Sequence, residues 1–146
     1  MRVLIDTCVI MDAVQNREPF AQDAQTILLA VANQQIMGYV TAKEMTDIYY
    51  LAHRCTHDQG AARTIMGRLC TLLYILDTTE SDIRRALASA LSDYEDAVMV
   101  ETALREEMDC IVTRNLPDFG ASPVPAYSPH DFLIKLEQGW SQIDEN

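Results

Sequence analysis

The sequence predicts an α/β fold in three layers, with a central, mostly parallel sheet of about four or five strands and helices on both faces. Short runs that are apolar at every position alternate with longer segments whose apolar residues recur every three or four positions. Runs of the first kind fit strands that are buried on both faces, and such strands belong to parallel sheets. The alternation therefore favours strand–helix–strand units over hairpins.

The expected elements follow one another without an internal repeat, a low-complexity tract or a linker. Strands are expected at residues 3–5, 38–40, 74–76 and 110–112, with a short edge strand at 124–126. Helices are expected where apolar residues form a stripe, at residues 20–35, 41–55, 57–72, 81–91, 94–108 and 128–136. We therefore expect a single domain over residues 1–137, followed by a polar tail over residues 138–146.

The composition excludes several classes of protein. The 146 residues include 22 acidic and 11 basic side chains, for a formal net charge of -11, which argues against a broad basic face that grips nucleic acid. Carboxylates gathered around divalent cations are an exception, because the cation reverses the local charge. No apolar run approaches the roughly 18 residues of a membrane span, and the first residues lack the features of a signal peptide.

The cysteines indicate a reducing environment. All four are far apart in the sequence and none forms a pair with the spacing of metal ligands; they are Cys8, Cys55, Cys70 and Cys110. We expect them to be free, mostly buried thiols in a cytoplasmic protein.

Polar side chains follow the ends of three expected strands. They are Asp6 after the first strand, Asp77 after the third, and Thr113, Asn115 and Asp118 after the fourth. Open α/β sheets bind their ligands beyond the carboxyl ends of the strands. We therefore expect these groups to meet at one edge of the sheet.

Two expected helices each add a pair of acids. Glu44 and Asp47 are three residues apart on one helix, and Asp93 and Asp96 are three apart near the start of another, so each pair shares a helix face. Unpaired buried carboxylates are costly, and hard divalent cations such as Mg²⁺ or Mn²⁺, which take oxygen ligands, offset that cost. The pattern predicts a carboxylate metal site that includes Asp6.

Most of these acids also have a purely structural interpretation, which the sequence leaves open. The acids that suit helix caps or turns are Asp6, Asp77, Asp93 and Asp118. Glu44 suits a capping box that begins at Thr41. Asp47 and Asp96 are harder to explain in this way, because each lies inside an expected helix among apolar neighbours.

Four segments, in order along the chain, resemble the PIN-domain family. They are VLIDTCVIMDAV, GYVTAKEMTDIYYLA, DYEDAVMVETALREEMDCIVTRNLPDF and VPAYSPHDFL. The small single-domain members of that family include the VapC-type toxins of toxin–antitoxin pairs. The resemblance implies a parallel sheet flanked by helices, acidic residues that bind Mg²⁺ or Mn²⁺, and cleavage of RNA.

By this resemblance Asp6, Asp47 and Asp96 match the three principal acids, which are both metal ligands and catalytic residues. Asp118 is the substitute for the fourth catalytic and metal-binding acid, because Asn115 occupies the position after Thr-Arg where the family often has a carboxylate. The residues expected to support the site are Thr7, Glu44, Asp93, Thr113 and Asn115.

The implied function is that of a metal-dependent endoribonuclease. A water activated by Mg²⁺ or Mn²⁺ attacks the phosphorus, and the products carry a 5′-phosphate and a 3′-hydroxyl. Arg114, which follows the fourth strand, is expected to bind the scissile phosphate of the substrate. If the chain is a toxin, its partner is a small antitoxin with a basic segment that faces the acidic site. The family also implies a homodimer.

Two other functions remain open. A PIN-like module with a weakened site, kept for binding or regulation, is favoured by Asn115 and by Cys8, which stands where the family commonly has asparagine. A receiver-type or phosphoryl-transfer protein with Asp6 as nucleophile is the other, although no second acid stands two residues after Asp6. RNA cleavage that needs a divalent cation would argue against the first, and a phospho-aspartate trapping test separates the second.

Overall fold

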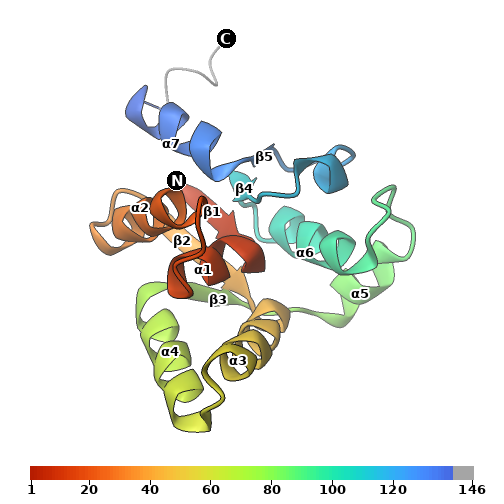
Figure 1. The fold of residues 1–146 in the computed structure, drawn as a ribbon. Helices are drawn as coiled ribbons and strands as arrows, with labels where there is room; N and C mark the ends of the chain where they lie inside the picture. Colours follow the sequence, from red (N-terminus) through yellow and green to blue (C-terminus); the bar gives the residue numbers. More distant parts are fainter. Residues whose placement is uncertain (140–146) are drawn as a thin grey trace.

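The computed structural model, which describes residues 1–139, contains a five-stranded parallel sheet with the strand order β3-β2-β1-β4-β5. The strands are β1 (Arg2–Ile5), β2 (Met37–Thr41), β3 (Tyr74–Leu76), β4 (Cys110–Val112) and β5 (Ala126–Tyr127). β1 lies in the centre, where Val3 is paired with Gly38 of β2 on one side and with Cys110 of β4 on the other. All five strands run in one direction, so their carboxyl ends share one edge of the sheet (Figure 1).

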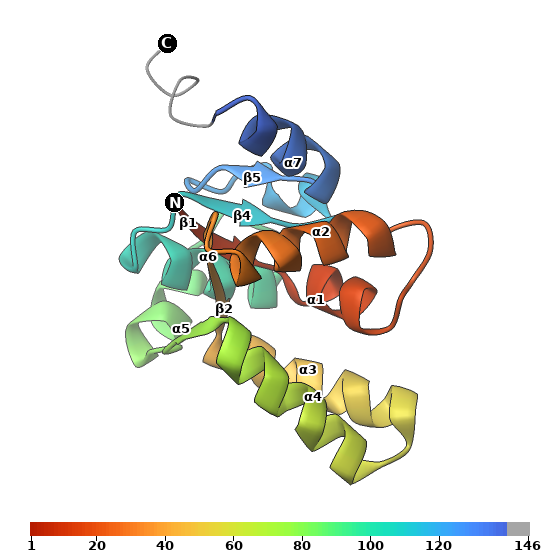
Figure 2. The same cartoon turned by 90° about the vertical axis from the view of Figure 1, so that its left-hand side faces the viewer.

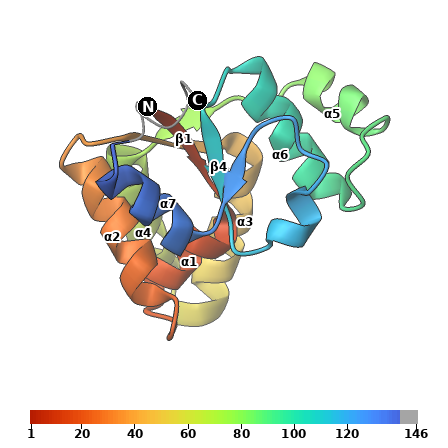
Figure 3. The same ribbon diagram turned by 90° about the horizontal axis from the view of Figure 1, so that it is seen from above.

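The connections between the strands are mainly helical. The helices are α1 (Thr7–Val14), α2 (Ala21–Ala32), α3 (Ala42–Thr56), α4 (Gln59–Leu72), α5 (Glu80–Ala86), α6 (Tyr94–Arg105), the 3-10 helix η1 (Leu116–Phe119) and α7 (Pro129–Glu137). In Figure 2, α3 and α4 lie side by side below the sheet, and they pack against each other. Figure 3 shows α1, α2, α4 and α7 on one side of the sheet and α5 and α6 on the other. The predicted three-layer α/β fold is confirmed.

Each face of the sheet has its own hydrophobic core, and β1 contributes to both. Val3 and Ile5 belong to the core that α1, α2, α3, α4 and α7 cover, whereas Leu4 belongs to the core beneath α5 and α6. All three side chains are fully buried. Because helices cover both faces, the strand can carry only apolar residues here. The first acid after the strand, Asp6, therefore comes at the edge of the sheet.

α2 and α6 each end before the expected residue because the backbone turns early. α2 ends at Ala32 and α6 ends at Arg105, short of the expected residues 35 and 108. Gln34 has a φ of 61° and Glu107 a φ of 56°. These left-handed conformations stop a right-handed helix.

The expected helix over residues 81–91 is wrong beyond Ala86, where α5 ends. Leu91 is buried in the core beneath α6, while Leu87 is exposed. In a continued helix Leu87 and Leu91 would be four residues apart and would share one face. The chain leaves the helix after Ala86, so Leu91 can be buried while Leu87 stays exposed. The edge strand, expected at residues 124–126, lies instead at Ala126–Tyr127.

None of the four cysteines, all of which lie within the described residues, forms a disulfide bond. Cys110 is buried, but Cys55 and Cys70 are exposed, so the expectation of mostly buried thiols is wrong for those two. No helix in the described part of the chain combines the length and the apolar character needed to cross a membrane. Nearly all of the expected polar tail falls on residues 140–146, outside the described residues.

Candidate active site

A pocket of about 340 Å³ lies where β1 and β2 end, between α1, α3 and α6. The acids that line it are Asp6, Glu44, Asp47, Glu95 and Asp96. The rest of the lining comprises the polar residues Thr7, Thr41 and Lys43 and the apolar or aromatic residues Tyr50, Leu51, Val98 and Met99. The three acids that the sequence marks as principal thus meet in one pocket, and their role as metal ligands stays a prediction.

Asp6 joins β1 to α1 and has only 8% of its surface exposed. As the N-cap of α1, its Oδ1 accepts a hydrogen bond from the Thr7 N–H at 2.8 Å. Its Oδ2 accepts from the Thr113 hydroxyl at 2.8 Å and from the Cys8 thiol at 3.5 Å. Burial raises the pKa of Asp6, and these hydrogen bonds oppose the rise. The helix-cap interpretation is therefore correct, and the same carboxylate also lines the pocket.

Cys8 supplies a hydrogen-bond donor beside Asp6. Burial, followed by the neighbouring Asp6 charge, raises the pKa of the Cys8 thiol to about 12. The thiol is therefore protonated at neutral pH, and its S–H can donate to the Asp6 carboxylate. Cysteine at this position thus preserves a donor to the first acid of the site.

Glu44 caps α3 and also lines the pocket, while its role in a metal site stays a prediction. It closes the capping box of α3, where its N–H donates to the Thr41 hydroxyl at 3.1 Å and its Oε1 accepts from the Thr41 N–H at 3.0 Å. Its Oε2 accepts from the Thr7 hydroxyl at 3.4 Å. Burial, and then the charge of Asp6, raise the pKa of Glu44 well above its usual range. Glu44 is therefore a buried acid of the pocket as well as a cap.

Asp96 lies in the first turn of α6, and its N–H donates to the side chain of Asp93 at 3.0 Å. The expectation that Asp93 caps this helix is confirmed. Burial, followed by the charges of Asp93, Asp6 and Asp118, raises the pKa of Asp96 to about 7. Since the Asp6 charge also raises the pKa of Glu44, these carboxylates repel one another within the pocket.

This repulsion predicts that the metal-free protein loses stability as the pH rises from about 4 to about 8. The pKa of Asp96 rises from 3.8 to about 7 on folding, so between these values the folded chain holds a proton that the unfolded chain has released. The stabilisation of the folded state by this proton is therefore lost as the pH rises through about 7. Because Asp96 is partly open to solvent, its share of the free energy of unfolding is on the order of 1–2 kcal/mol.

Urea unfolding in EDTA at a series of pH values measures this slope. Asp96→Asn is expected to flatten it, because asparagine does not titrate. A slope that is the same in the wild type and in Asp96→Asn would contradict the assignment to Asp96.

Lys43 bridges α3 and α6 beside the pocket. Its Nζ lies 2.6 Å from Asp47 Oδ2 and 3.1 Å from Glu95 Oε2. Burial lowers the pKa of Lys43, but the hydrogen bonds to both carboxylates outweigh this effect and raise it, so the ammonium stays charged. Neither Lys43 nor Glu95 was expected in the site. The spacing of four residues between Lys43 and Asp47, which is typical of helical ion pairs, is the signal for the first contact.

Lys43→Met is expected to tighten Mn²⁺ binding by roughly 3- to 10-fold at low salt, because the substitution removes a positive charge that competes for two carboxylates of the pocket. Isothermal calorimetry measures the affinity. Lys43→Arg, which keeps the charge, is the control and is expected to bind Mn²⁺ as the wild type does. Equal affinity in all three proteins would show that Lys43 does not compete with the cation.

The residues that follow β4 lie near the Asp6 and Asp96 side of the pocket. The buried Thr113 hydroxyl donates to Asp6 and accepts from the Asn115 N–H at 3.0 Å. Asp118 is exposed in η1, close enough to raise the pKa of Asp96. Asn115 and Asp118 do not themselves line the pocket.

Arg114 forms an ion pair outside the pocket. Its Nε and Nη2 donate to the carboxylate of Asp12 at 2.6 and 3.2 Å, and the Asp12 side chain is completely buried. The guanidinium also lies 4.0 Å from the centre of the Phe20 ring. These contacts tie the loop after β4 to α1 and to the start of α2. Burial raises the pKa of Asp6, and the Arg114 charge also opposes this rise. The expected contact of Arg114 with a scissile phosphate stays a prediction.

The donor chemistry of the pocket suits Mg²⁺ or Mn²⁺. Asp6, Glu44 and Asp96 offer oxygen atoms, and the pKa of each is raised, so each would gain from a nearby positive charge. Within residues 1–139, no three Asp, Glu, His or Cys side chains are already arranged as a ligand group for a metal ion. The chemical type and the charge of these residues therefore suit a divalent cation, although the described residues are not already arranged as a complete set of ligands.

A parallel sheet with an acidic pocket at its carboxyl edge defines the class of open α/β proteins that bind their ligands at that edge. A family model described as PIN domain matches residues 2–117, and the chain therefore belongs to the PIN-domain family. This membership confirms the resemblance and sets aside the receiver-type alternative with Asp6 as nucleophile. No curated protein matches the sequence.

Several solved structures share the fold. A toxin–antitoxin complex from Klebsiella pneumoniae is 19% identical, with a TM-score of 0.64 over 87% of this chain and 97% of that chain. VapBC2 from Rickettsia felis, bound to a DNA fragment from its promoter, is 14% identical, with a TM-score of 0.63 over 88% of this chain and 98% of that chain. VapC20 from Mycobacterium tuberculosis, a toxin that cleaves the sarcin–ricin loop, is 13% identical, with a TM-score of 0.60 over 75% of this chain and 86% of that chain.

Proposed function

We propose that this protein is an endoribonuclease that depends on Mg²⁺ or Mn²⁺ and acts as the toxin of a toxin–antitoxin pair in the cytoplasm. The observation that carries the proposal is the pocket at the end of β1, where the buried acids Asp6 and Glu44 and the partly buried Asp96 repel one another. Like charges held together in this way cost stability, and their cost is offset when they bind a cation. The similarity in fold to VapC20, a toxin that cleaves the sarcin–ricin loop, supports RNA as the substrate.

Different residues of the chain would bind the cation and fix the direction of its ligands. Asp6, Glu44 and Asp96 would hold the cation, with Asp47 joining them once it leaves Lys43. A divalent cation supplies activation of water and neutralisation of charge on the phosphate. The fixed hydrogen bonds to Asp6 from α1 and from the loop after β4 set the direction of its carboxylate.

Asp118 and Asn115 would orient the attacking water from the Asp96 side. Attack in line with the 3′ oxygen breaks the bond between that oxygen and the phosphorus. The products are then a 3′-hydroxyl and a 5′-phosphate.

The test is cleavage of a mixed RNA pool by the purified protein, together with calorimetric titration with Mn²⁺. We expect Mn²⁺ to bind and to support cleavage, and EDTA to stop it. Ligation of the products reports their 5′-phosphate ends. Cleavage in EDTA, or products that end in a cyclic phosphate, would contradict the proposal.

We propose a small antitoxin as partner, with a basic segment that covers the acidic pocket. The formal charge of -11 and the acids of the pocket favour such a segment. The similar structures include toxin–antitoxin complexes, which supports a partner of this kind. A homodimer, and a single domain over residues 1–137, belong to the same proposal.

A second candidate function is a PIN-fold binding or regulatory module with weakened catalysis. The ion pairs of Lys43 with Asp47 and Glu95 favour it, because one ammonium already offsets part of the negative charge of these two acids. Binding of Mn²⁺ without cleavage of any RNA in the pool would favour this module over the nuclease.

A further inference from the structure

Tyr50 stands at the acidic pocket with 64% of its surface exposed. It follows Asp47 by three residues on α3, so the two side chains share a helix face. Among the described residues, the Tyr50 ring has no hydrogen bond, ion pair or ring partner. Its neighbour Tyr49, in contrast, stacks on His53 with the ring centres 6.1 Å apart.

The lining of the pocket combines acidic and apolar side chains. The acids lie on α3, on α6 and at the end of β1, and the same two helices add Tyr50, Leu51, Val98 and Met99. A nucleotide has the same combination, because it joins a charged phosphate to a flat base whose faces are apolar. A volume of about 340 Å³ is at the lower end for ligand pockets, which is room for about one nucleotide.

We infer that Tyr50 stacks on an unpaired nucleobase next to the scissile phosphate; this inference rests on the proposed ribonuclease function. Aromatic side chains stack on bases of every kind, since each base has a flat π-face. Bases inside a duplex are paired and stacked on one another, and do not offer that face. Tyr50 is therefore expected to contact an unpaired base of any identity.

The contact can be measured with 2-aminopurine, a base whose fluorescence falls when it stacks on an aromatic ring. Short single-stranded RNAs that carry 2-aminopurine at varied positions are titrated with protein in Ca²⁺, and a gel checks that the RNA stays intact. We expect quenching with the wild type and with Tyr50→Phe, which keeps the ring. With Tyr50→Ala we expect no quenching and RNA binding that is weaker by roughly 5- to 150-fold.

Two controls separate stacking from damage to the protein. Tyr74 is similarly exposed, at 58%, and does not line the pocket, so Tyr74→Ala is expected to quench and bind as the wild type does. Mn²⁺ titration of Tyr50→Ala is expected to give the wild-type affinity, because tyrosine is not among the acids of the site.

Equal quenching in the wild type and in Tyr50→Ala would overturn the inference, as would wild-type cleavage of duplex RNA at the rate of single-stranded RNA. If Tyr50→Ala keeps the quenching but loses a protein that copurifies with the wild type, Tyr50 serves a protein partner and the inference is wrong. Failure of the proposed function appears separately, as a wild-type protein that neither binds Mn²⁺ nor cleaves RNA.

Discussion

Replacing Asp6 with asparagine is expected to abolish Mn²⁺ binding and to lower RNA cleavage by more than about 100-fold. The Asp6 carboxylate ends the central strand and is held by Thr7, Cys8 and Thr113, and asparagine offers one oxygen and no charge in its place. Stability in EDTA is expected to fall only slightly, by about 1 kcal/mol, because the NH₂ group of asparagine cannot accept from the Thr113 hydroxyl that donates to Asp6 Oδ2. Asparagine is also a good N-cap, and burial already disfavours the charged form of Asp6, whose pKa it raises.

Asp58→Asn is the matched control for this variant. Asp58 caps α4 as Asp6 caps α1, accepting from the Gly60 and Ala61 N–H groups at 2.7 and 3.2 Å, but it does not line the pocket. We expect Asp58→Asn to bind Mn²⁺ and cleave RNA normally in calorimetric and gel assays. If Asp6→Asn kept the wild-type Mn²⁺ affinity, Asp6 would be a helix cap only. A loss of equal size in both variants would assign the effect to capping.

Asp6 and Glu44 each cap a helix and also line the pocket, and this combination has a physical explanation. A carboxylate has about four lone-pair sites on two oxygens, so it can accept capping hydrogen bonds and still face a pocket. In a parallel sheet a strand end leads into a helix N-terminus, and the unpaired N–H groups there require an acceptor. The capping and ligand interpretations of the sequence were therefore not exclusive at these two positions.

The sheet and the position of Asp6 could be predicted because they depend on local pattern. The run Val3–Ile5 is apolar at every position, which requires cover on both faces, and the next residue is an acid. The prediction that acids of two helices join Asp6 required only the rule that ligands bind beyond strand ends. Glu44 and Asp96 do lie in that pocket.

The ion pairs could not be predicted in the same way, because they depend on the packing of distant segments. Arg114 and Asp12 are 102 positions apart, and nothing in the local pattern of Thr-Arg-Asn shows that a buried acid on α1 holds the arginine. The contact of Lys43 with Glu95 likewise joins two helices. A charged residue that the sequence marks as a candidate can therefore contact either a ligand or another part of the chain. The three-dimensional structure is needed to tell which of the two it contacts.

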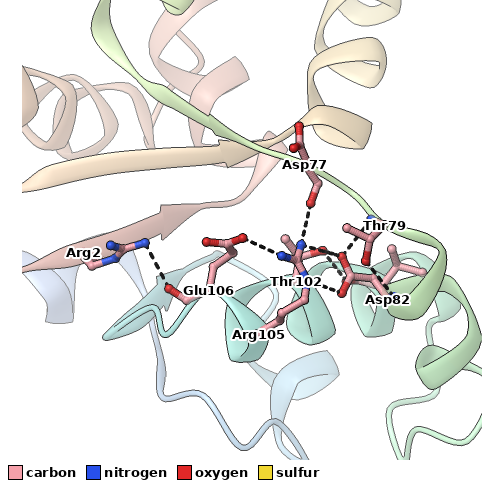
Figure 4. A network of polar contacts seen from close by, with 8 residues as sticks. Arg2, Asp77, Thr79, Asp82, Thr102, Arg105 and Glu106 are labelled. Atoms are coloured by element: carbon pink, nitrogen blue, oxygen red, sulfur yellow. Dashed lines mark hydrogen bonds and ion pairs between the residues drawn. The ribbon is translucent and has the colours of Figure 1, made fainter.

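Asp82 illustrates how much such a contact can contribute, since it holds α5 against α6 in the network of Figure 4. The side chain is 1% exposed, and it accepts from the Thr79 N–H at 3.0 Å and the Thr102 hydroxyl at 2.8 Å. The Arg105 guanidinium donates to both of its oxygens, at 3.0 and 3.1 Å, and also to the Asp77 carbonyl at 2.8 Å. One carboxylate thus joins the loop after β3 to both helices.

Asp82→Ala is expected to lower the free energy of unfolding at pH 7 by about 3–5 kcal/mol, because it leaves the Arg105 charge and two further donors without their acceptor. Burial alone would raise the pKa of Asp82, but the hydrogen bonds from Arg105, Thr79 and Thr102 lower it to about 2. The stabilisation is therefore present above the ordinary pKa of 3.8 and is lost as the pH falls toward 2. Urea unfolding of both proteins at pH 7 and at pH 3 measures it.

Glu80→Ala, on the same helix, is the control. It removes an ion pair with Arg84 at 2.8 Å in which both side chains are at least 75% exposed, and screening by solvent leaves such pairs with little effect on stability. A loss in Asp82→Ala no larger than that in Glu80→Ala would contradict the role of the network. Because Asp82 does not line the acidic pocket, the folded Asp82→Ala protein is expected to bind Mn²⁺ normally, so that stability and metal binding respond to different acids of the same chain.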